Sequence, residues 1–167
     1  FMVIASIVET LRHALIKNGF ILFYNNSDPL HKQHFEDNAL LLNLLFSILI
    51  SLVFFLGSNW IAGLLQVPDL ANVLHIYVAS IFTLIPFTHR EFKKAAQADF
   101  KSVSFLYSVR YLFFLLAVSV HFVFSLECTL TNLAVYYGMS ILIGFLASIL
   151  VGDTGSLPKL NYRKQVM

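Results

Sequence analysis

The sequence is poor in charged residues and almost without cysteine. Charged side chains make up 12% of the 167 residues and hydrophobic ones 58%, whereas soluble domains average about 25% charged residues. A soluble domain of this size buries only about two-thirds of its unfolded surface, which is too little to hide so much apolar area. The single cysteine, Cys128, excludes an intrachain disulfide and a zinc site built from thiolates. Apolar residues, among them 17 Phe, make up most of the sequence, and this composition predicts that the chain lies in lipid.

Four long stretches with few or no charges predict membrane-spanning helices. A helix needs about 20 largely apolar residues to cross a bilayer, and we place spans near 39–65, 71–89, 103–125 and 130–151. A fifth apolar run, 1–8, is too short to cross, and we interpret it as the inner end of a helix that begins before this sequence. A signal peptide is the alternative, but the positive charges follow this run instead of preceding it.

The predicted fold class is therefore all-α. We expect a polytopic membrane helix bundle with four full transmembrane helices and one partial N-terminal helix, in a single membrane domain over 1–167. The expected helices cover about 1–24, 39–65, 71–98, 101–125 and 130–152.

Lysine and arginine alternate between successive connectors. The five connectors carry three, none, four, none and three of these residues in chain order. Basic connectors lie in the cytoplasm by the positive-inside rule. We therefore expect loops 25–38 and 90–101 and the C-terminus to be cytoplasmic, and 66–70 and 126–129 to lie outside.

Arg110 is the one charge inside a predicted span. It lies nine residues beyond Lys101, which is about 13 Å of helix and near the middle of the apolar core. An arginine there costs at least about 2.5 kcal/mol if it faces lipid, so it should face the protein interior. Two interpretations remain: it holds a phosphate group, or it pairs with a carboxylate on a helix outside this sequence.

A second polar group lies near the N-terminus. Glu9, His13 and Lys17 are successive i, i+4 neighbours with Arg12 beside them, and they form either an anion-binding or proton-relaying cluster or a set of weak local ion pairs. Tyr107 shares the helix face of Arg110. The candidate substrate-binding residues are Arg110, Arg12, Lys17, His13 and Tyr107. Because no catalytic motif and no metal-ligand pattern occurs, we expect no enzyme activity, no catalytic residue, no metal and no cofactor.

Other polar and small residues favour helix packing. Two series repeat at a spacing of four and let helices approach closely or hydrogen-bond: Asn43, Ser47 and Ser51 in the first, and Ser140, Gly144, Ser148 and Gly152 in the second. The first series has a second interpretation, as the wall of a hydrophilic cavity. Pro86 removes a backbone hydrogen bond and is expected to kink the second span.

Several helix-end motifs resemble those of a known family. They are Leu11-Arg-His-Ala-Leu-Ile-Lys-Asn-Gly, Val67-Pro-Asp-Leu, and Arg90 to Ser102, in which Ala95 to Lys101 ends in Asp-Phe-Lys. These segments look like the N-terminal part of polysaccharide-biosynthesis flippases of the O-antigen and teichuronic-acid type, in the multidrug/oligosaccharidyl-lipid/polysaccharide exporter superfamily.

The resemblance implies twelve to fourteen helices in two lobes around a central cavity that binds a polyprenyl-diphosphate-linked oligosaccharide. By that reading the sequence is part of the N-terminal lobe of a bacterial inner-membrane flippase. Its partners would be lipid-linked oligosaccharide, membrane lipids and the second lobe, and not nucleic acid. The alternative is a small integral membrane scaffold or assembly protein that works by helix packing. A membrane enzyme acting on lipids is a third reading, which lacks a visible catalytic pair.

Overall fold

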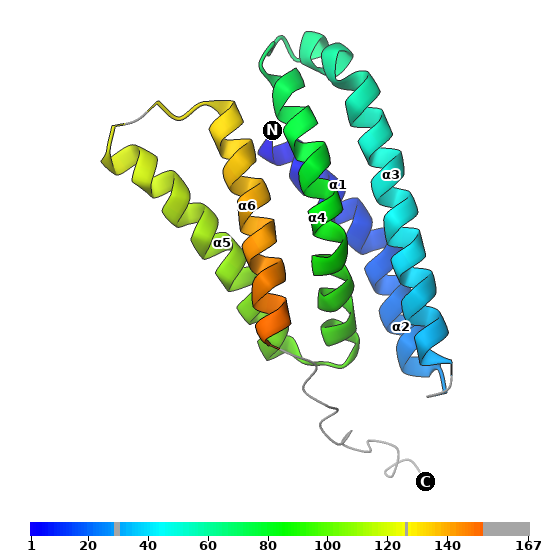
Figure 1. Cartoon of the computed structure of the whole chain (residues 1–167). Coiled ribbons are helices and arrows are strands. Elements are labelled where there is room, and N and C mark those ends of the chain that lie inside the picture. The colour runs from blue at the N-terminus through cyan, green and yellow to red at the C-terminus, as the bar shows by residue number, and fades with distance from the viewer. Residues whose placement is uncertain (29–30, 126, 152–167) are drawn as a thin grey trace.

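The computed structural model describes residues 1–28, 31–125 and 127–151, and every regular element within them is a helix. The first segment is continuous and consists of α1 (Met2–Arg12), a π-helical turn η1 (His13–Lys17) and α2 (Asn18–Asn26). Four longer helices follow (Figure 1): α3 (Lys32–Leu64), α4 (Leu70–Ala96), α5 (Phe100–Val123) and α6 (Leu130–Leu150). The predicted all-α fold class is confirmed.

Helices α3 to α6 are each long and apolar enough to cross a membrane. Their outward faces carry large apolar side chains, such as Leu56 at 77% exposure and Phe122 at 89%, as expected for surfaces that meet lipid. Helices α3 and α4 extend beyond their apolar stretches into polar residues, at the start of α3 and at the end of α4. The predicted loop 25–38 is therefore too long, because α3 begins at Lys32, and the predicted loop 90–101 shrinks to 97–99.

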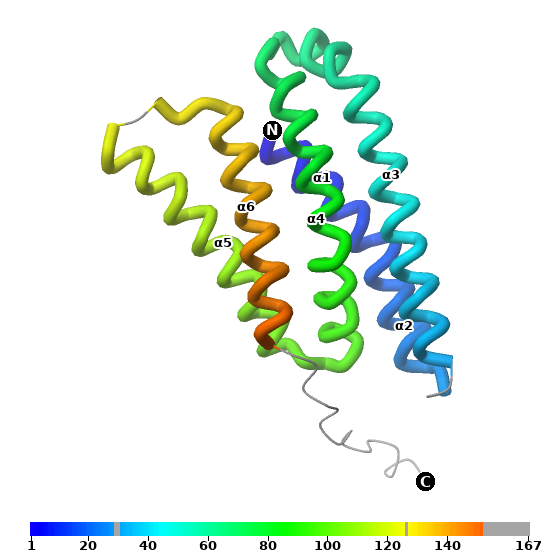
Figure 2. Tube along the Cα trace, in the orientation of Figure 1, coloured from blue at the N-terminus to red at the C-terminus, as the bar shows by residue number. Residues whose placement is uncertain are grey.

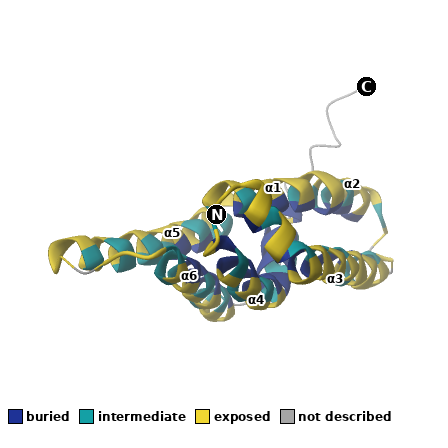
Figure 3. Cartoon of the chain, turned by 90° about the horizontal axis from the view of Figure 1, so that it is seen from above, coloured by how far each residue is buried: buried dark blue, intermediate teal, exposed yellow. Residues whose placement is uncertain are grey.

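The helices form two layers. Helices α5, α6, α4 and α3 stand side by side, and the α1–η1–α2 segment crosses obliquely behind α4 toward α3 (Figures 1 and 2). The view from above shows this segment on one side of the row, with its outer face exposed (Figure 3). Helix α4 is central, and fully buried residues such as Leu74, Ile81 and Leu84 lie along it. The crossing places one face of α1 inside the bundle.

Helices α4 and α6 approach closely at a small residue. A Cβ atom on Gly144 would lie 3.0 Å from Cε2 of Phe87 and 3.4 Å from Cβ of Arg110. Ser140 and Ser148 are buried on the same side of α6, which fits the packing predicted for this series. Gly152, its last member, lies outside the described residues. Helix α4 continues without interruption through Pro86, and the kink there stays a prediction.

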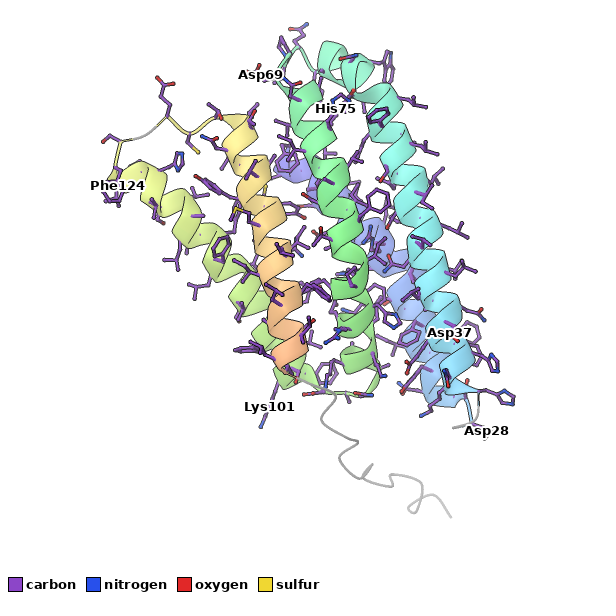
Figure 4. The ribbon with its side chains drawn as sticks, in the orientation of Figure 1. Asp28, Asp37, Asp69, His75, Lys101 and Phe124 are labelled. Atoms are coloured by element: carbon purple, nitrogen blue, oxygen red, sulfur yellow. The ribbon has the colours of Figure 1, made fainter. Side chains whose placement is uncertain are left out.

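The connections between helices divide between the two ends of the bundle. The α3–α4 and α5–α6 connections lie at one end, near the labelled Asp69 and Phe124, and the α2–α3 and α4–α5 connections lie at the other, near Asp28 and Lys101 (Figure 4). Lys32 at the start of α3, Lys93 and Lys94 near the end of α4 and Lys101 at the start of α5 therefore share one end, as a positive-inside arrangement requires. Arg12 and Lys17, which the sequence counted toward the first connector, lie instead in the α1–η1 segment. The predicted cytoplasmic C-terminus lies outside the described residues.

The turn between α4 and α5 contains both a C-cap and an N-cap. The backbone N–H groups of Ala98 and Asp99 donate to the carbonyls of Ala95 and Lys94, each at 3.0 Å, and Ala98 has a positive φ of 58°, which is a Schellman motif. Asp99 then caps α5: its Oδ1 accepts from the Ser102 backbone N–H at 3.2 Å and its Oδ2 from the Ser102 hydroxyl at 2.6 Å. These hydrogen bonds hold the pKa of Asp99 below its usual value.

We expect Asp99→Ala to lower the free energy of unfolding by about 1 kcal/mol, because α5 loses its cap. The control is Asp69→Ala, since Asp69 precedes α4 without a side-chain capping bond, and it should change little. The pKa of Asp99 is lower in the folded protein than in the unfolded chain. Its carboxylate therefore stabilises the fold at a pH above the unfolded pKa, and this stabilisation is lost as the pH falls through the folded pKa. The difference between the variants should therefore begin to shrink as the pH falls below about 4 and vanish only below the lowered pKa of Asp99. Thermal unfolding in detergent should show a smaller difference at pH 3 than at pH 7. An equal loss in both variants would contradict the capping role.

Candidate functional site: a buried charged cluster

Six charged or titratable side chains from the two layers meet inside the bundle. We call this set the charged cluster, and its members are Glu9, Arg12, His13, Lys17, Glu91 and Arg110. Arg12 and Glu91 are 0% exposed and Arg110 is 1% exposed. The oblique path of α1 and η1 supplies four members, and α4 and α5 supply one each. Charges at such burial require paired partners or a ligand, since a lone buried charge is costly.

Glu9 and Arg110 form a two-pronged ion pair between α1 and α5. Nη2 of Arg110 lies 2.5 Å from Oε1 of Glu9, and Nη1 lies 3.2 Å from Oε2. The hydroxyl of Tyr137 on α6 also donates to Glu9, and its ring lies 5.1 Å from the Arg110 guanidinium. The sequence interpretation that placed the partner carboxylate on a helix outside this sequence is wrong, because Glu9 fills that role.

A second ion pair joins η1 to α4. Nζ of Lys17 lies 2.6 Å from Oε1 of Glu91, and Nε2 of His13 lies 3.5 Å from Oε2. The Tyr107 hydroxyl is 3.4 Å from the same His13 nitrogen. Sequence reasoning missed Glu91 because it lies among the basic residues of a stretch assigned to a loop. The apolar Phe87 and Phe92 around it were the available signal of a buried helix face.

Arg12 is the cation of the cluster that forms no ion pair among the described residues. Its Nη2 donates to the hydroxyl of Ser47 on α3 at 3.0 Å, and its guanidinium lies 5.6 Å from the centre of the Phe46 ring. Its Nε and Nη1 are buried and have no hydrogen-bond partner within the described part of the chain. This side chain retains unused capacity to bind an anion.

The cluster has an excess of positive charge. Arg12, Lys17 and Arg110 are cations, and Glu9 and Glu91 are the two carboxylates, each already engaged by one of the other cations. The arrangement can therefore attract an anionic group, and the chemistry it offers is charge-assisted hydrogen bonding.

The structure brings all five predicted binding residues, Arg110, Arg12, Lys17, His13 and Tyr107, into or beside the charged cluster. Their part in substrate binding stays a prediction. The polar series of α3 has mixed contacts: Asn43 donates to the Thr88 hydroxyl at 2.7 Å, which is helix packing, and Ser47 contacts Arg12.

Comparison with known proteins agrees with the resemblance seen in the sequence. A family model described as polysaccharide biosynthesis protein matches residues 1–160, which is nearly the whole chain. No curated protein and no solved structure matches the chain. The predicted resemblance to a flippase-type family of polysaccharide biosynthesis is confirmed.

Proposed function

Because this chain belongs to the polysaccharide biosynthesis protein family, we propose that it is part of a transporter that flips a polyprenyl-diphosphate-linked oligosaccharide across the bacterial inner membrane. At a coarser level, the family match and four helices able to span a membrane make it a multi-pass membrane protein of polysaccharide biosynthesis, with a role in export or flipping. The match favours a transporter over an enzyme.

The observation that supports the proposed substrate is the unpaired guanidinium of Arg12. It is 0% exposed, and two of its nitrogens have no hydrogen-bond partner among the described residues, a state that is costly unless an anion binds. A diphosphate is a compact multivalent anion, and a guanidinium binds phosphate oxygens through paired N–H donors. In this proposal Arg12 binds the diphosphate, with Lys17 and His13 beside it and Tyr107 lining the path. We assign Arg110 to holding α1 in place, since Glu9 already matches its charge.

Lobe movement gives the buried cluster access to substrate. In a two-lobed transporter, alternating access arises when one lobe rocks against the other around a site near the midplane. The second lobe of the resemblance would face the exposed outer side of α1. This lobe and the lipid-linked oligosaccharide are the partners we propose.

A scaffold or assembly protein is the second candidate. The close packing of α6 on α4 at Gly144 favours it, because small residues that bring helices together are typical of membrane assembly interfaces. A scaffold gives no reason to keep an unpaired arginine in the interior, so the transporter ranks first.

Ligand binding distinguishes the two candidates. The protein in lipid nanodiscs is titrated with geranylgeranyl diphosphate, geranylgeraniol and phosphatidylglycerol. We expect the diphosphate to bind at least 10-fold more tightly than the alcohol, because only it offers a multivalent anion, and phosphatidylglycerol not to compete. Equal binding of diphosphate and alcohol, or binding of neither, would overturn the proposed substrate class.

Cytoplasmic placement of the basic connectors is also part of the proposal, and Cys128 tests it. Cys128 is exposed, in the α5–α6 connection, so a membrane-impermeant maleimide added outside intact cells should label it. The matched control is Gln97→Cys in a Cys128→Ser background, at the opposite end of the bundle, which should react only after the cells are opened. The reverse pattern would invert the orientation.

A further inference from the structure

The first helical segment contains a π-helical turn that its own sequence does not require. Over His13–Lys17 the helix widens, and the Asn18 N–H donates to the His13 carbonyl five residues back. Such turns are rare and are often found at functional sites. The five residues include neither proline nor glycine, and the flanking residues Arg12 and Asn18 have ordinary helical angles. Contacts with other helices must therefore hold the turn open.

Ion pairs on both sides of the turn supply those contacts, together with the buried apolar packing of Ile16, Phe20 and Tyr24. Glu9 precedes it and binds Arg110 and Tyr137, whereas Lys17 ends it and binds Glu91. If the turn relaxed to an α-helix, the part after it would rotate by about 100° and advance by about 1.5 Å relative to the part before it. Glu9 could keep its partners only if Lys17 left Glu91. The wide turn is therefore the conformation that satisfies both pairs together.

The two carboxylates are held unequally. Glu9 accepts two hydrogen bonds from Arg110 and one from Tyr137. Glu91 accepts a hydrogen bond from Lys17 through Oε1. Its buried Oε2 has no hydrogen-bond partner within residues 1–28, 31–125 and 127–151, and His13 Nε2 lies 3.5 Å away. A half-bonded carboxylate is the easier of the two to displace, because less of its lost solvation is replaced. The pair after the turn is therefore the weaker one.

We propose that Glu91 is a displaceable counter-ion that keeps Lys17 in place while the site is empty. A phosphate group bound at Arg12 also attracts Lys17, which lies five residues further along the same segment. Lys17 then pairs with the phosphate in place of Glu91. Once Lys17 leaves Glu91, η1 relaxes and α2 rotates, while α1 stays bound through Glu9. This inference rests on the proposed function for its ligand, but the rotation is a property of the chain itself.

Spin-label distances test the rotation without any ligand. In a Cys128→Ser background, one pair joins Leu22→Cys on α2 to Leu142→Cys on α6, and a second joins Ile7→Cys on α1 to the same α6 site; all three positions are exposed. Glu91→Gln should change the first distance by up to about 8 Å, given a helix radius of about 5–6 Å with side chains. The second distance should not change.

The matched control is Glu36→Gln, which removes another glutamate–lysine pair between helices, Glu36 to Lys93 at 3.2 Å; it should move neither distance. Lys17→Gln breaks the Glu91 pair from the other side and should reproduce the effect of Glu91→Gln, which covers the case that one variant fails to fold. No movement in either variant, or equal movement of both distances, overturns the proposal.

Inorganic pyrophosphate separates this proposal from the proposed function. We expect Glu91→Gln to bind pyrophosphate about 10-fold more tightly than the native protein, since no internal anion competes, and pyrophosphate to move α2 in the native protein. Binding without movement overturns the counter-ion role and leaves the proposed function intact. Movement in Glu91→Gln with no pyrophosphate binding by any variant supports the rotation and counts against the proposed function.

Discussion

Arg110→Ala should lower the free energy of unfolding by about 3–5 kcal/mol, the loss typical when one partner of a buried ion pair is removed. Among the described residues Glu9 would keep the Tyr137 hydroxyl as its one side-chain donor, and its charge would stay in the interior. Thermal unfolding of the purified protein in detergent and its level in the membrane both measure this effect. We expect a large fall in both.

A double variant identifies the cause of that loss. Arg110→Met with Glu9→Gln removes both charges and keeps similar volumes, so it should recover most of the stability. Arg90→Ala is the control for loss of an interior-facing arginine, because Arg90 donates to the Ser148 carbonyl at 2.9 Å and forms no part of the charged cluster. It should cost about 1.5–3 kcal/mol, and no second variant should be needed to offset an unpaired charge. A stable Arg110→Ala protein that no longer exports polysaccharide would instead give Arg110 the substrate role predicted from the sequence.

Arg12→Met should lower ligand affinity without lowering the free energy of unfolding, which is the opposite of the result expected for Arg110→Ala. Two nitrogens of this buried charge have no hydrogen-bond partner in the described part of the chain, so its removal should leave the free energy of unfolding unchanged or raise it by about 1 kcal/mol. Affinity for geranylgeranyl diphosphate should fall about 10- to 100-fold, since a charge-assisted hydrogen bond contributes about 1.5–3 kcal/mol. Thermal unfolding and ligand titration on the same samples measure both quantities.

Arg12→Lys provides the matched control. It keeps the charge and loses the planar guanidinium, so it should bind with intermediate affinity if geometry matters as well as charge. Normal diphosphate binding by Arg12→Met would remove the observation on which the proposed substrate rests. A loss of stability in Arg12→Met comparable with that of Arg110→Ala would instead make Arg12 structural.

The sequence predicted the spans because their signal is local. A run of about 20 apolar residues needs a helix in lipid whatever surrounds it, and this decides α3 to α6. The helix ends were less predictable, because a helix continues into polar sequence beyond the membrane, as α3 does at Lys32. No apolar pattern marks where that extension ends.

The pairings in the charged cluster depend on tertiary structure and were harder to predict. The sequence singled out Glu9, His13 and Lys17 by their spacing of four, with Arg12 beside them. One of its two interpretations was ion pairs within their own helix. The structure gives them partners on other helices instead. The wide turn at His13–Lys17 has no local signal, because it depends on where Glu91 and Arg110 lie in the folded bundle.

The pair between Glu9 and Arg110 also sets an order of assembly. The two residues lie 101 positions apart, so Glu9 is synthesised long before Arg110. Until α5 is made, the Glu9 carboxylate lacks this partner. When α5 reaches the translocon, its central arginine opposes release into lipid by about 2.5–3.5 kcal/mol. A neighbour that offers a carboxylate at that depth removes this penalty. We therefore expect α5 to insert less efficiently when α1 or the Glu9 carboxylate is removed.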